Sequence, residues 1–285
     1  MNTWQGTFKI WQNKDFGKIY ARFNSLKLYF LDDLQLFVSY RPIIGNTTLY
    51  LYSAPSEKKW INELKSLAQN LKVAKIWIYS INHLESLNNF FKEKIFTFVI
   101  NLADNKELLW EKIGKKTRNM IRKGEKMGVK VKLADQEEEF DQWWKVYSRA
   151  AEIKGFGKQK LLLVKKIFQE KKLSRLFLSI KDNKIIGGTL FLLDEYPMYW
   201  LGAFDKNFGD YAPGHINIWE AMLSLKKEGF QLLDLGGISF DEKDGSSRFK
   251  KSFNGEIKTE YIYEIPINLI KTKFINFVSK VKSKI

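Results

Sequence analysis

The sequence contains no cysteine and only two histidines, His83 and His215, among its 285 residues. The absence of cysteine excludes disulfide bonds, thiolate nucleophiles and cysteine-ligated metal sites. Two histidines with few partners also argue against a histidine-based metal centre or a Ser–His–Asp triad. We therefore expect no bound metal, and we expect both imidazole rings to serve in packing or helix capping.

The chain also lacks any apolar run long enough to span a membrane. Residues 1–5 do not show the basic and then apolar pattern of a signal peptide, so the expected location is the cytoplasm. Low-complexity linkers are absent, and the apolar and aromatic content is that of a folded globular protein.

Positive charge is in excess. The 48 basic and 32 acidic residues give a formal net charge of +16, which favours polyanions such as nucleic acid, anionic lipid headgroups or pyrophosphates. The alternative is a lysine-rich solvated surface that binds nothing in particular.

Short apolar strands alternate with amphipathic helices in two similar cycles that meet near Gly128. This alternation predicts an α/β or α+β fold. The first cycle has predicted strands at 26–30, 34–40, 48–52, 76–80 and 96–101 and helices at 57–71 and 105–127. The second has strands at 129–133, 176–180, 185–193, 198–204, 232–235 and 260–265 and helices at 137–153, 160–169 and 214–227.

The predicted helix 105–127 has an apolar stripe on one face and basic residues on the opposite face. Lys115, Arg118 and Arg122 belong to the basic face, and Gly124 allows close approach on the buried side. Such a face can bind the phosphates of tRNA or the pyrophosphate of a nucleotide or lipid carrier. The alternative is an ordinary solvated helix face.

A strand, a loop and a helix follow one another over residues 198–222, where Pro213 and Gly214 open the helix. This arrangement directs free backbone N–H groups beyond the end of the strand. The loop lacks the Arg/Gln-x-x-Gly-x-Gly pattern of acetyl-CoA-dependent enzymes of this layout, which argues against coenzyme A.

The segment 230–253 is the most informative. A strand is expected to end on the paired glycines Gly236 and Gly237, where another backbone or a ligand can come close. Lys250 follows, between Phe249 and Phe253. An ammonium group held against aromatic faces suits the stabilisation of a developing oxyanion. The alternative is a strand end followed by a surface lysine.

The C-terminal segment 267–285 is predicted to form an amphipathic helix, with lysines beside an apolar stripe. We expect the stripe to pack on the protein's own core, and contact with a membrane surface is the alternative. The stripe consists of Ile270, Phe274, Phe277, Val278, Val281 and Ile285.

In its ordered set of motifs the sequence resembles the Fem family, the aminoacyl-tRNA-dependent transferases that build peptidoglycan cross-bridges. The matching segments are 115–122 ahead of Gly128, 186–189, 198–204, 211–213, the helix containing Trp219 and Glu220, 234–238 and 249–253. The resemblance implies two GNAT-like domains, each with a mixed central sheet flanked by helices. The first would comprise residues 1–128 with 266–285, and the second residues 129–265.

The resemblance also implies an activity and its residues. The enzyme would pass an amino acid from its tRNA ester to the amine of a stem peptide on a muropeptide precursor, with no cofactor. Lys250 with Phe249 would stabilise the oxyanion near the aminoacyl end. The remaining implied residues are Tyr199, Tyr211, Asp234, Gly236, Gly237 and Lys18 for substrate, and Lys115, Arg118, Arg122 and Arg248 for tRNA or phosphate.

Several points stay open at this stage. Glu195 falls near the position of a phosphate-binding arginine in some family members, so the acceptor can be nucleotide-linked or lipid-linked, the latter with peripheral contact at the inner membrane surface. Asp205 and Asp234 are the candidate acceptors of the amine proton. The protein is expected to be a monomer or weak oligomer. The alternative functions are an acyl-CoA-dependent N-acyltransferase and a non-catalytic RNA- or membrane-binding protein.

Overall fold

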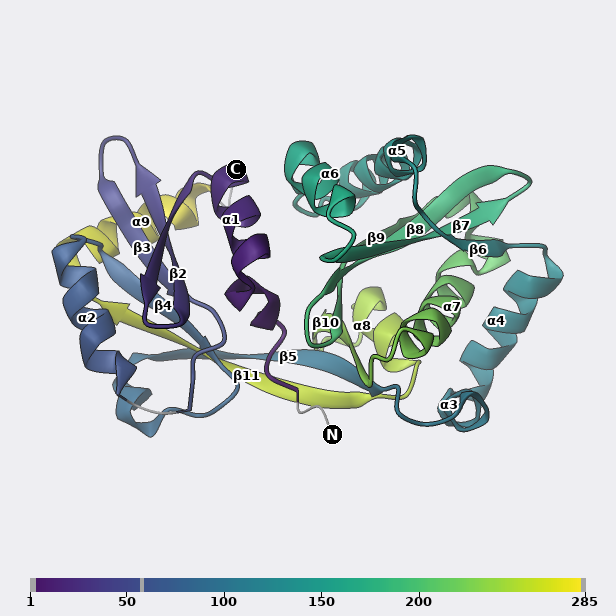
Figure 1. Ribbon diagram of the computed structural model, residues 1–285, viewed down its shortest axis with the longest axis horizontal. Coiled ribbons are helices and arrows are strands. Elements are labelled where there is room, and N and C mark those ends of the chain that lie inside the picture. Colours follow the sequence, from purple (N-terminus) through teal and green to yellow (C-terminus); the bar gives the residue numbers. More distant parts are fainter. Residues whose placement is uncertain (1–3, 57–58, 283–285) are drawn as a thin grey trace. The chain divides into compact units, whose positions relative to one another are not determined.

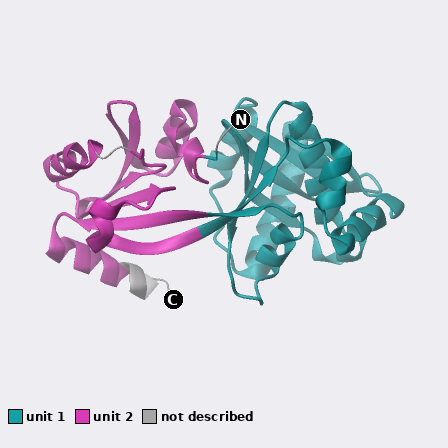
Figure 2. Ribbon diagram, turned by 90° about the horizontal axis from the view of Figure 1, so that it is seen from below, with its two compact units in different colours: residues 1–4, 96–258 teal, residues 5–95, 259–285 magenta. Residues whose placement is uncertain are grey.

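The computed structural model describes residues 4–56 and 59–282, which form a mixed α/β fold of two compact units (Figure 1). Unit 1 contains Trp4 and Phe96–Lys258, and unit 2 contains Gln5–Ile95 and the described part of Thr259–Ile285. Two strands, β5 (Phe91–Asn101) and β11 (Glu256–Pro266), carry the chain from one unit into the other (Figure 2).

Unit 2 is built on a mixed sheet in the order β1, β2, β3, β4, β11. Its strands are β1 (Leu26–Leu31), β2 (Leu34–Arg41), β3 (Gly45–Leu51), β4 (Lys75–Ser80) and β11. All neighbours are antiparallel except β3 and β4, which α2 (Trp60–Asn70) connects in parallel. Helices cover both faces of this sheet, because successive side chains of β2 point to opposite faces. Leu36 and Val38 pack toward α2, while Phe37 lies on the other face with Tyr20 of α1 (Lys14–Phe23).

Unit 1 has the sheet order β5, β10, β9, β8, β7, β6. Helices α5 and α6 cover one face, and α4 and α7 cover the other (Figure 1). Its further strands are β6 (Lys130–Leu133), β7 (Ser174–Lys181), β8 (Lys184–Leu193), β9 (Pro197–Phe204) and β10 (Leu232–Ile238). Its helices are α3 (Lys106–Lys112), α4 (Lys115–Lys126), α5 (Glu137–Lys154), α6 (Leu161–Gln169), α7 (Pro213–Lys227) and α8 (Gly245–Lys251). Short 3-10 helices are η1 (Lys9–Gln12) and η2 (Glu85–Phe90) in unit 2 and η3 (Lys206–Tyr211) in unit 1.

The single helix predicted over 105–127 is wrong, because the structure has two helices, α3 and α4, separated by Ile113 and Gly114. The guanidinium of Arg118 in α4 binds the end of α3, where it donates to the carbonyl oxygens of Trp110, Glu111 and Ile113 at 3.3, 2.8 and 2.8 Å. Gly124 is buried as expected, and a Cβ there would lie 3.2 Å from Ile216 of α7.

The compact units divide the chain differently from the predicted boundary at residues 128 and 129. Residues 96–128 group with the second cycle, because Phe98, Leu109 and Ile121 share one core with Trp219 and Leu233. Gly128 indicates where a helix ends, which is a local property of the sequence. The boundary between the two units depends instead on which hydrophobic core each helix packs against.

The C-terminal helix α9 (Leu269–Lys282) belongs to unit 2, but its predicted packing face is wrong. Thr272 and Ile275 are buried, whereas Ile270, Phe274 and Phe277 are 84%, 52% and 67% exposed. Ile285 and the side chain of Val281 lie outside the described residues, as does the predicted start of α2 at Glu57. Within the described part of the chain, no helix combines the length and apolar character that crossing a bilayer requires.

Candidate active site

The central feature of unit 1 is a bulge in β10 beside the point where β10 meets β9. These two parallel strands pair at Asp234 and Met198, and the register of β10 against β5 shifts between Asp234 and Gly237. Gly236 adopts φ +77°, a left-handed conformation that glycine takes without steric cost. The prediction that the strand ends at the two glycines is wrong, because β10 continues through the bulge to Ile238.

Asp234 is completely buried and holds the bulge in place. Its carboxylate accepts hydrogen bonds from the backbone N–H of Gly236 at 2.7 Å, from the Trp4 indole at 3.2 Å and from the Thr97 hydroxyl. A carboxylate that accepts several hydrogen bonds is stabilised in its charged form. These contacts favour a positioning role for Asp234 over the proton-accepting role considered from the sequence.

Lys250 lies on α8, whose first turn is capped by Asp244 through the N–H of Ser246 at 2.9 Å. The Lys250 ammonium donates to the carbonyl oxygen of Gly237 at 2.8 Å and lies 5.4 Å from the centre of the Tyr199 ring. Burial lowers the pKa of Lys250 below its usual value, opposed by the negative charges of Asp234 and Asp244. One carbonyl bond leaves further N–H groups of the ammonium for a substrate oxygen.

The aromatic partner of Lys250 differs from the predicted one. The ammonium lies against Tyr199, while Phe249 and Phe253 contact each other edge to face, with ring centres 5.3 Å apart. The imidazole of His215 packs on Phe249 at 5.1 Å. Burial, followed by the charge of Lys116, lowers the pKa of His215, so the ring is a neutral packing element, in agreement with the expectation for the histidines.

The start of α7 is filled by aromatic rings. A Cβ on Gly214 would lie 3.2 Å from the Phe204 ring and 3.5 Å from the Phe249 ring. The glycine therefore allows close packing of β9, α7 and α8.

The structure separates the two tyrosines implied as substrate-binding. Tyr199 is next to Lys250, and burial raises its pKa to about 12, so its hydroxyl stays protonated at neutral pH. Tyr211 packs instead with Phe208, at a ring distance of 5.7 Å, and the Lys181 ammonium lies 5.9 Å from its ring.

The basic residues of α4 differ in their contacts and in their exposure. Arg118 is engaged by the carbonyl groups at the end of α3, which gives it a structural role. Arg122 is exposed and lies over the Trp110 ring at 5.2 Å, and Lys115 is exposed in the first turn. Arg248 is exposed on α8, two residues from Lys250.

Unit 2 has its own groove, with a volume of about 1020 Å³. Tyr50, Trp77 and Tyr79 contribute aromatic side chains to its lining, together with four basic side chains. The cations are Arg41, Lys75, Lys92 and Lys273. Lys18 lies exposed on α1 of the same unit and is not among the lining residues.

Residues 4–56 and 59–282 contain no candidate metal site, because no three His, Asp or Glu side chains form a cluster suited to an ion.

Asp205, the other predicted proton acceptor, caps η3 by accepting from the N–H of Asn207 at 3.0 Å. Unit 1 therefore presents a fixed ammonium at a strand bulge that the buried Asp234 carboxylate holds in place, and the ammonium is suited to stabilising negative charge on an acyl group.

Two contributors to this site were not found from the sequence. Trp4 and Thr97 both donate to Asp234, although they lie 230 and 137 residues away along the chain. Neither residue carries a local motif, since the contact depends on how β5 and the N-terminal segment meet β10.

Comparison with known proteins gives a consistent picture. The chain matches the model of the FemAB family over residues 1–170 and that of an acetyltransferase (GNAT) domain over residues 112–251. No curated protein matches it by sequence.

Several solved structures share the fold. FemX aligns with a TM-score of 0.73 at 14% identity, covering 96% of this chain and 99% of that one. The C-terminal domain (DUF2156) of a lysylphosphatidylglycerol synthetase from Agrobacterium fabrum gives 0.65 at 12%, covering 95% and 96%. L-PGS from Bacillus licheniformis gives 0.61 at 10%, covering 90% and 92%. At these identities the likeness concerns the fold alone.

Proposed function

The chain belongs to the FemAB family, and we propose that it transfers an amino acid from aminoacyl-tRNA to the amine of a peptidoglycan precursor stem peptide. The observation that carries this proposal is the Lys250 ammonium, half-buried, bonded to Gly237 at the β10 bulge and lying against Tyr199. A fixed cation in a partly dry site is worth more to a developing oxyanion than one in water.

The proposed reaction needs little besides this cation. The acceptor amine attacks the ester carbonyl carbon, and the carbonyl π electrons move onto oxygen, where Lys250 donates a hydrogen bond. Collapse of the tetrahedral intermediate expels the ribose oxygen, which leaves as a hydroxyl with the proton that the amine releases. An activated ester requires neither a histidine nor a cysteine nucleophile, in keeping with a chain that has two histidines and no cysteine.

Acceptor binding is proposed for unit 2. Its aromatic and cationic groove suits an anionic precursor, because Tyr50 offers a flat face for a sugar or base while Lys92 and Lys273 offer charge for phosphates. Lys18 on α1 would bind precursor phosphates from outside the groove, as the family resemblance implies. The GNAT-like character of unit 2 stays a prediction.

The exposed face of α9 supports peripheral contact with a membrane as part of the same function. Ile270, Phe274 and Phe277 form an apolar stripe one turn apart, and Lys273 beside them is exposed. Such a surface fits the boundary between acyl chains and anionic headgroups. This contact favours a lipid-linked acceptor over a nucleotide-linked one.

A second candidate function is N-acyl transfer from an acyl-CoA, favoured by the GNAT match over residues 112–251. The loop before α7 argues against it, because residues 205–214 lack the glycine-rich pattern that cradles a pyrophosphate in acetyl-CoA-dependent enzymes.

The testing experiment measures transfer of labelled amino acids from a mixture of charged tRNAs to nucleotide-linked and lipid-linked muropeptide precursors. Phosphatidylglycerol is included as an acceptor, because one of the similar structures is named as that of a lysylphosphatidylglycerol synthetase. Ribonuclease-sensitive labelling of a precursor is expected. Labelling from acyl-CoA alone would favour the second candidate, and labelling of phosphatidylglycerol alone would replace the acceptor.

A further inference from the structure

The side chain of Tyr199 lies along its own strand, with the phenol end beside Gly202. A Cβ at Gly202 would lie 1.9 Å from the Tyr199 hydroxyl oxygen and 2.6 Å from the ring carbon that carries it. The hydroxyl oxygen of Thr189, a fully buried residue of β8, lies 3.3 Å from the same point. The phenol end therefore occupies the space that a side chain at position 202 would fill, next to Thr189.

A bulge in β9 makes this orientation possible. The register of β8 against β9 shifts at this point, and Trp200 is the additional residue of β9. Trp200 and Leu201 are consecutive, yet both pack in the core that lies on the α5 side of the sheet. Residues three apart in a regular strand point to opposite faces, whereas the bulge places Tyr199 and Gly202 on the same face.

The Tyr199 ring contacts both β8 and the Lys250 ammonium. Phe191 of β8 meets the ring edge to face, with ring centres 5.8 Å apart, and the Lys250 ammonium lies over the ring at 5.4 Å from its centre. A Cβ at Gly236 would lie 3.2 Å from the Tyr199 carbonyl oxygen and 3.7 Å from the Lys250 ammonium nitrogen. The bulges of β9 and β10 therefore bring the ring and the ammonium together, because a glycine at position 236 permits the close approach.

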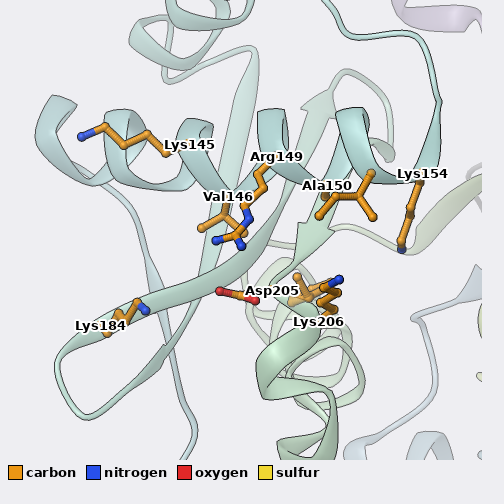
Figure 3. A pocket seen from close by; sticks show the side chains of 10 residues that line it. Lys145, Val146, Arg149, Ala150, Lys154, Lys184, Asp205 and Lys206 are labelled. Carbon is orange, nitrogen blue, oxygen red and sulfur yellow. The ribbon is translucent and has the colours of Figure 1, made fainter.

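Another lysine of unit 1 offers a comparison for this pair. Lys184 lines a cavity of about 230 Å³ between α5 and the end of β9 (Figure 3), and its ammonium lies over the Phe208 ring at 5.2 Å from the ring centre. Lys184 is exposed, whereas Lys250 is half-buried. A cation–π contact is stronger where the ammonium is partly removed from water, so the Tyr199 ring has the greater effect on the position of its ammonium.

We propose that Tyr199 is a positioning residue for Lys250 and acts through the face of its ring, not through its hydroxyl. Gly202 provides the space for the phenol end, and Thr189 is the polar neighbour of the hydroxyl. This role differs from the substrate contact that the family resemblance implies for Tyr199. The inference rests on the proposed function, because it concerns the ammonium that would meet the oxyanion. A ring that limits the directions of this ammonium affects the chemical step and not the binding of substrate.

The kinetic test compares two replacements of Tyr199. Tyr199→Leu removes the ring and is expected to lower kcat roughly ten-fold, with the KM of donor and acceptor unchanged. The conservative variant Tyr199→Phe keeps the ring and is expected to recover most of that loss. The matched control is Phe208→Leu, which removes the ring beside Lys184 and is expected to keep near-normal turnover.

Two kinetic results would overturn the proposal. The first is a common kcat for Tyr199→Leu and Tyr199→Phe, since a low value would assign the effect to the hydroxyl and a near-normal value would show that the ring has none. The second is a rise in KM in place of the fall in kcat, which would make Tyr199 a substrate contact.

A second measurement does not depend on transfer. The lysines are converted to isotope-labelled dimethyl forms, which stay charged, and the Lys250 signal in the proton–carbon spectrum is identified by its absence in Lys250→Arg. Methyl protons over the face of an aromatic ring are shielded, so this signal is expected upfield of those of exposed lysines. The shift should persist in Tyr199→Phe and disappear in Tyr199→Leu, while the Lys184 signal should respond only to Phe208→Leu.

The spectrum of the unmodified protein alone can overturn the proposal, even where a variant does not fold. A Lys250 signal at the position of exposed lysines would show that the ammonium does not lie over the ring, and an upfield shift that persists in Tyr199→Leu would assign the shielding to another ring. Since neither donor nor acceptor is present, a failure of the proposed transfer activity would leave this result intact.

Discussion

The ammonium nitrogen of Lys250 lies 2.8 Å from the carbonyl oxygen of Gly237, which ties α8 to the bulged end of β10. Next to it, Lys251 makes the same kind of contact, 2.9 Å from the carbonyl oxygen of Ser239, but its ammonium lies over Phe240 and not over Tyr199. Both lysines therefore attach α8 to the segment that follows the bulge, and Lys250, unlike Lys251, lies beside Tyr199.

Replacement of Lys250 with alanine is expected to lower kcat by about 10²-fold, the usual cost of removing one oxyanion partner. Lys251→Ala is the matched control and is expected to retain near-normal turnover. The measurement is steady-state transfer at saturating donor and acceptor, with melting curves to verify folding. Similar rates for the two variants would show that Lys250 does not meet the oxyanion.

Gly236→Ala is expected to destabilise the protein by about 1–3 kcal/mol, the range for a residue forced into a rare backbone conformation. The added Cβ would combine φ +77° with an approach of 3.2 Å to the Tyr199 carbonyl oxygen. Gly237→Ala is the control, because its Cβ would find its nearest neighbour, the Phe96 carbonyl oxygen, at 3.9 Å. Urea denaturation of both variants measures the difference, and equal midpoints would contradict the role of the bulge.

The site also shows which parts of the structure can be predicted from a sequence. Most strands follow from apolar runs, and Lys250 was singled out from its aromatic neighbours. The sequence does not predict helix α1, because Gly17 interrupts the helical pattern. A glycine is needed at this position because the side-chain amide nitrogen of Gln35 lies 1.8 Å from the place that a Cβ would take. Asp234 was identified, but its donors Trp4 and Thr97 were not, because long-range partners leave no local pattern.

The tail illustrates the limit of periodicity. The apolar stripe of α9 predicts the buried face of the helix only if the surface below it is apolar. Here that surface is polar: Thr272 donates to the Ala74 carbonyl oxygen at 2.7 Å, and Asn276 accepts from the Lys75 ammonium at 2.6 Å. The helix therefore docks through the face that carries Thr272, Ile275 and Asn276, and Ile270, Phe274 and Phe277 remain exposed.

Lowering the pH is expected to destabilise the protein through His215. Burial and the charge of Lys116 lower the pKa of this ring in the folded state, so the unfolded chain binds a proton more readily. The contribution of the neutral ring is present above the unfolded value of about 6.5 and is lost as pH falls below it through the folded value. The urea midpoint should therefore fall more between pH 7 and pH 5 in the unmodified protein than in His215→Gln, with the exposed His83→Gln as control. A parallel pH dependence in the unmodified protein and His215→Gln would exclude the effect.

The exposed stripe of α9 predicts binding to anionic membranes. Phe274 and Phe277 are 52% and 67% exposed, and transfer of such rings to a bilayer interface contributes on the order of 1 kcal/mol or more each. Phe274→Ser with Phe277→Ser should reduce cosedimentation with vesicles of anionic phospholipid by about ten-fold or more, while the melting temperature stays constant because both rings are solvent-exposed. Leu162→Ser is the control, since Leu162 is also 67% exposed but lies on α6 of unit 1.

Salt and lipid composition separate the two parts of this interaction. Binding that weakens with salt and is reduced on zwitterionic vesicles would reflect the lysines beside the stripe, while the loss in the phenylalanine variant reflects apolar insertion. If the double variant binds anionic vesicles as well as Leu162→Ser does, the stripe does not contact the membrane. In that case ultracentrifugation would test another partner, because concentration-dependent association would identify a second copy of the chain. Transfer to a lipid-linked acceptor in vesicles should fall more than transfer to a nucleotide-linked acceptor in solution, because Phe277 also lines the acceptor groove and the vesicle assay adds the loss of membrane binding.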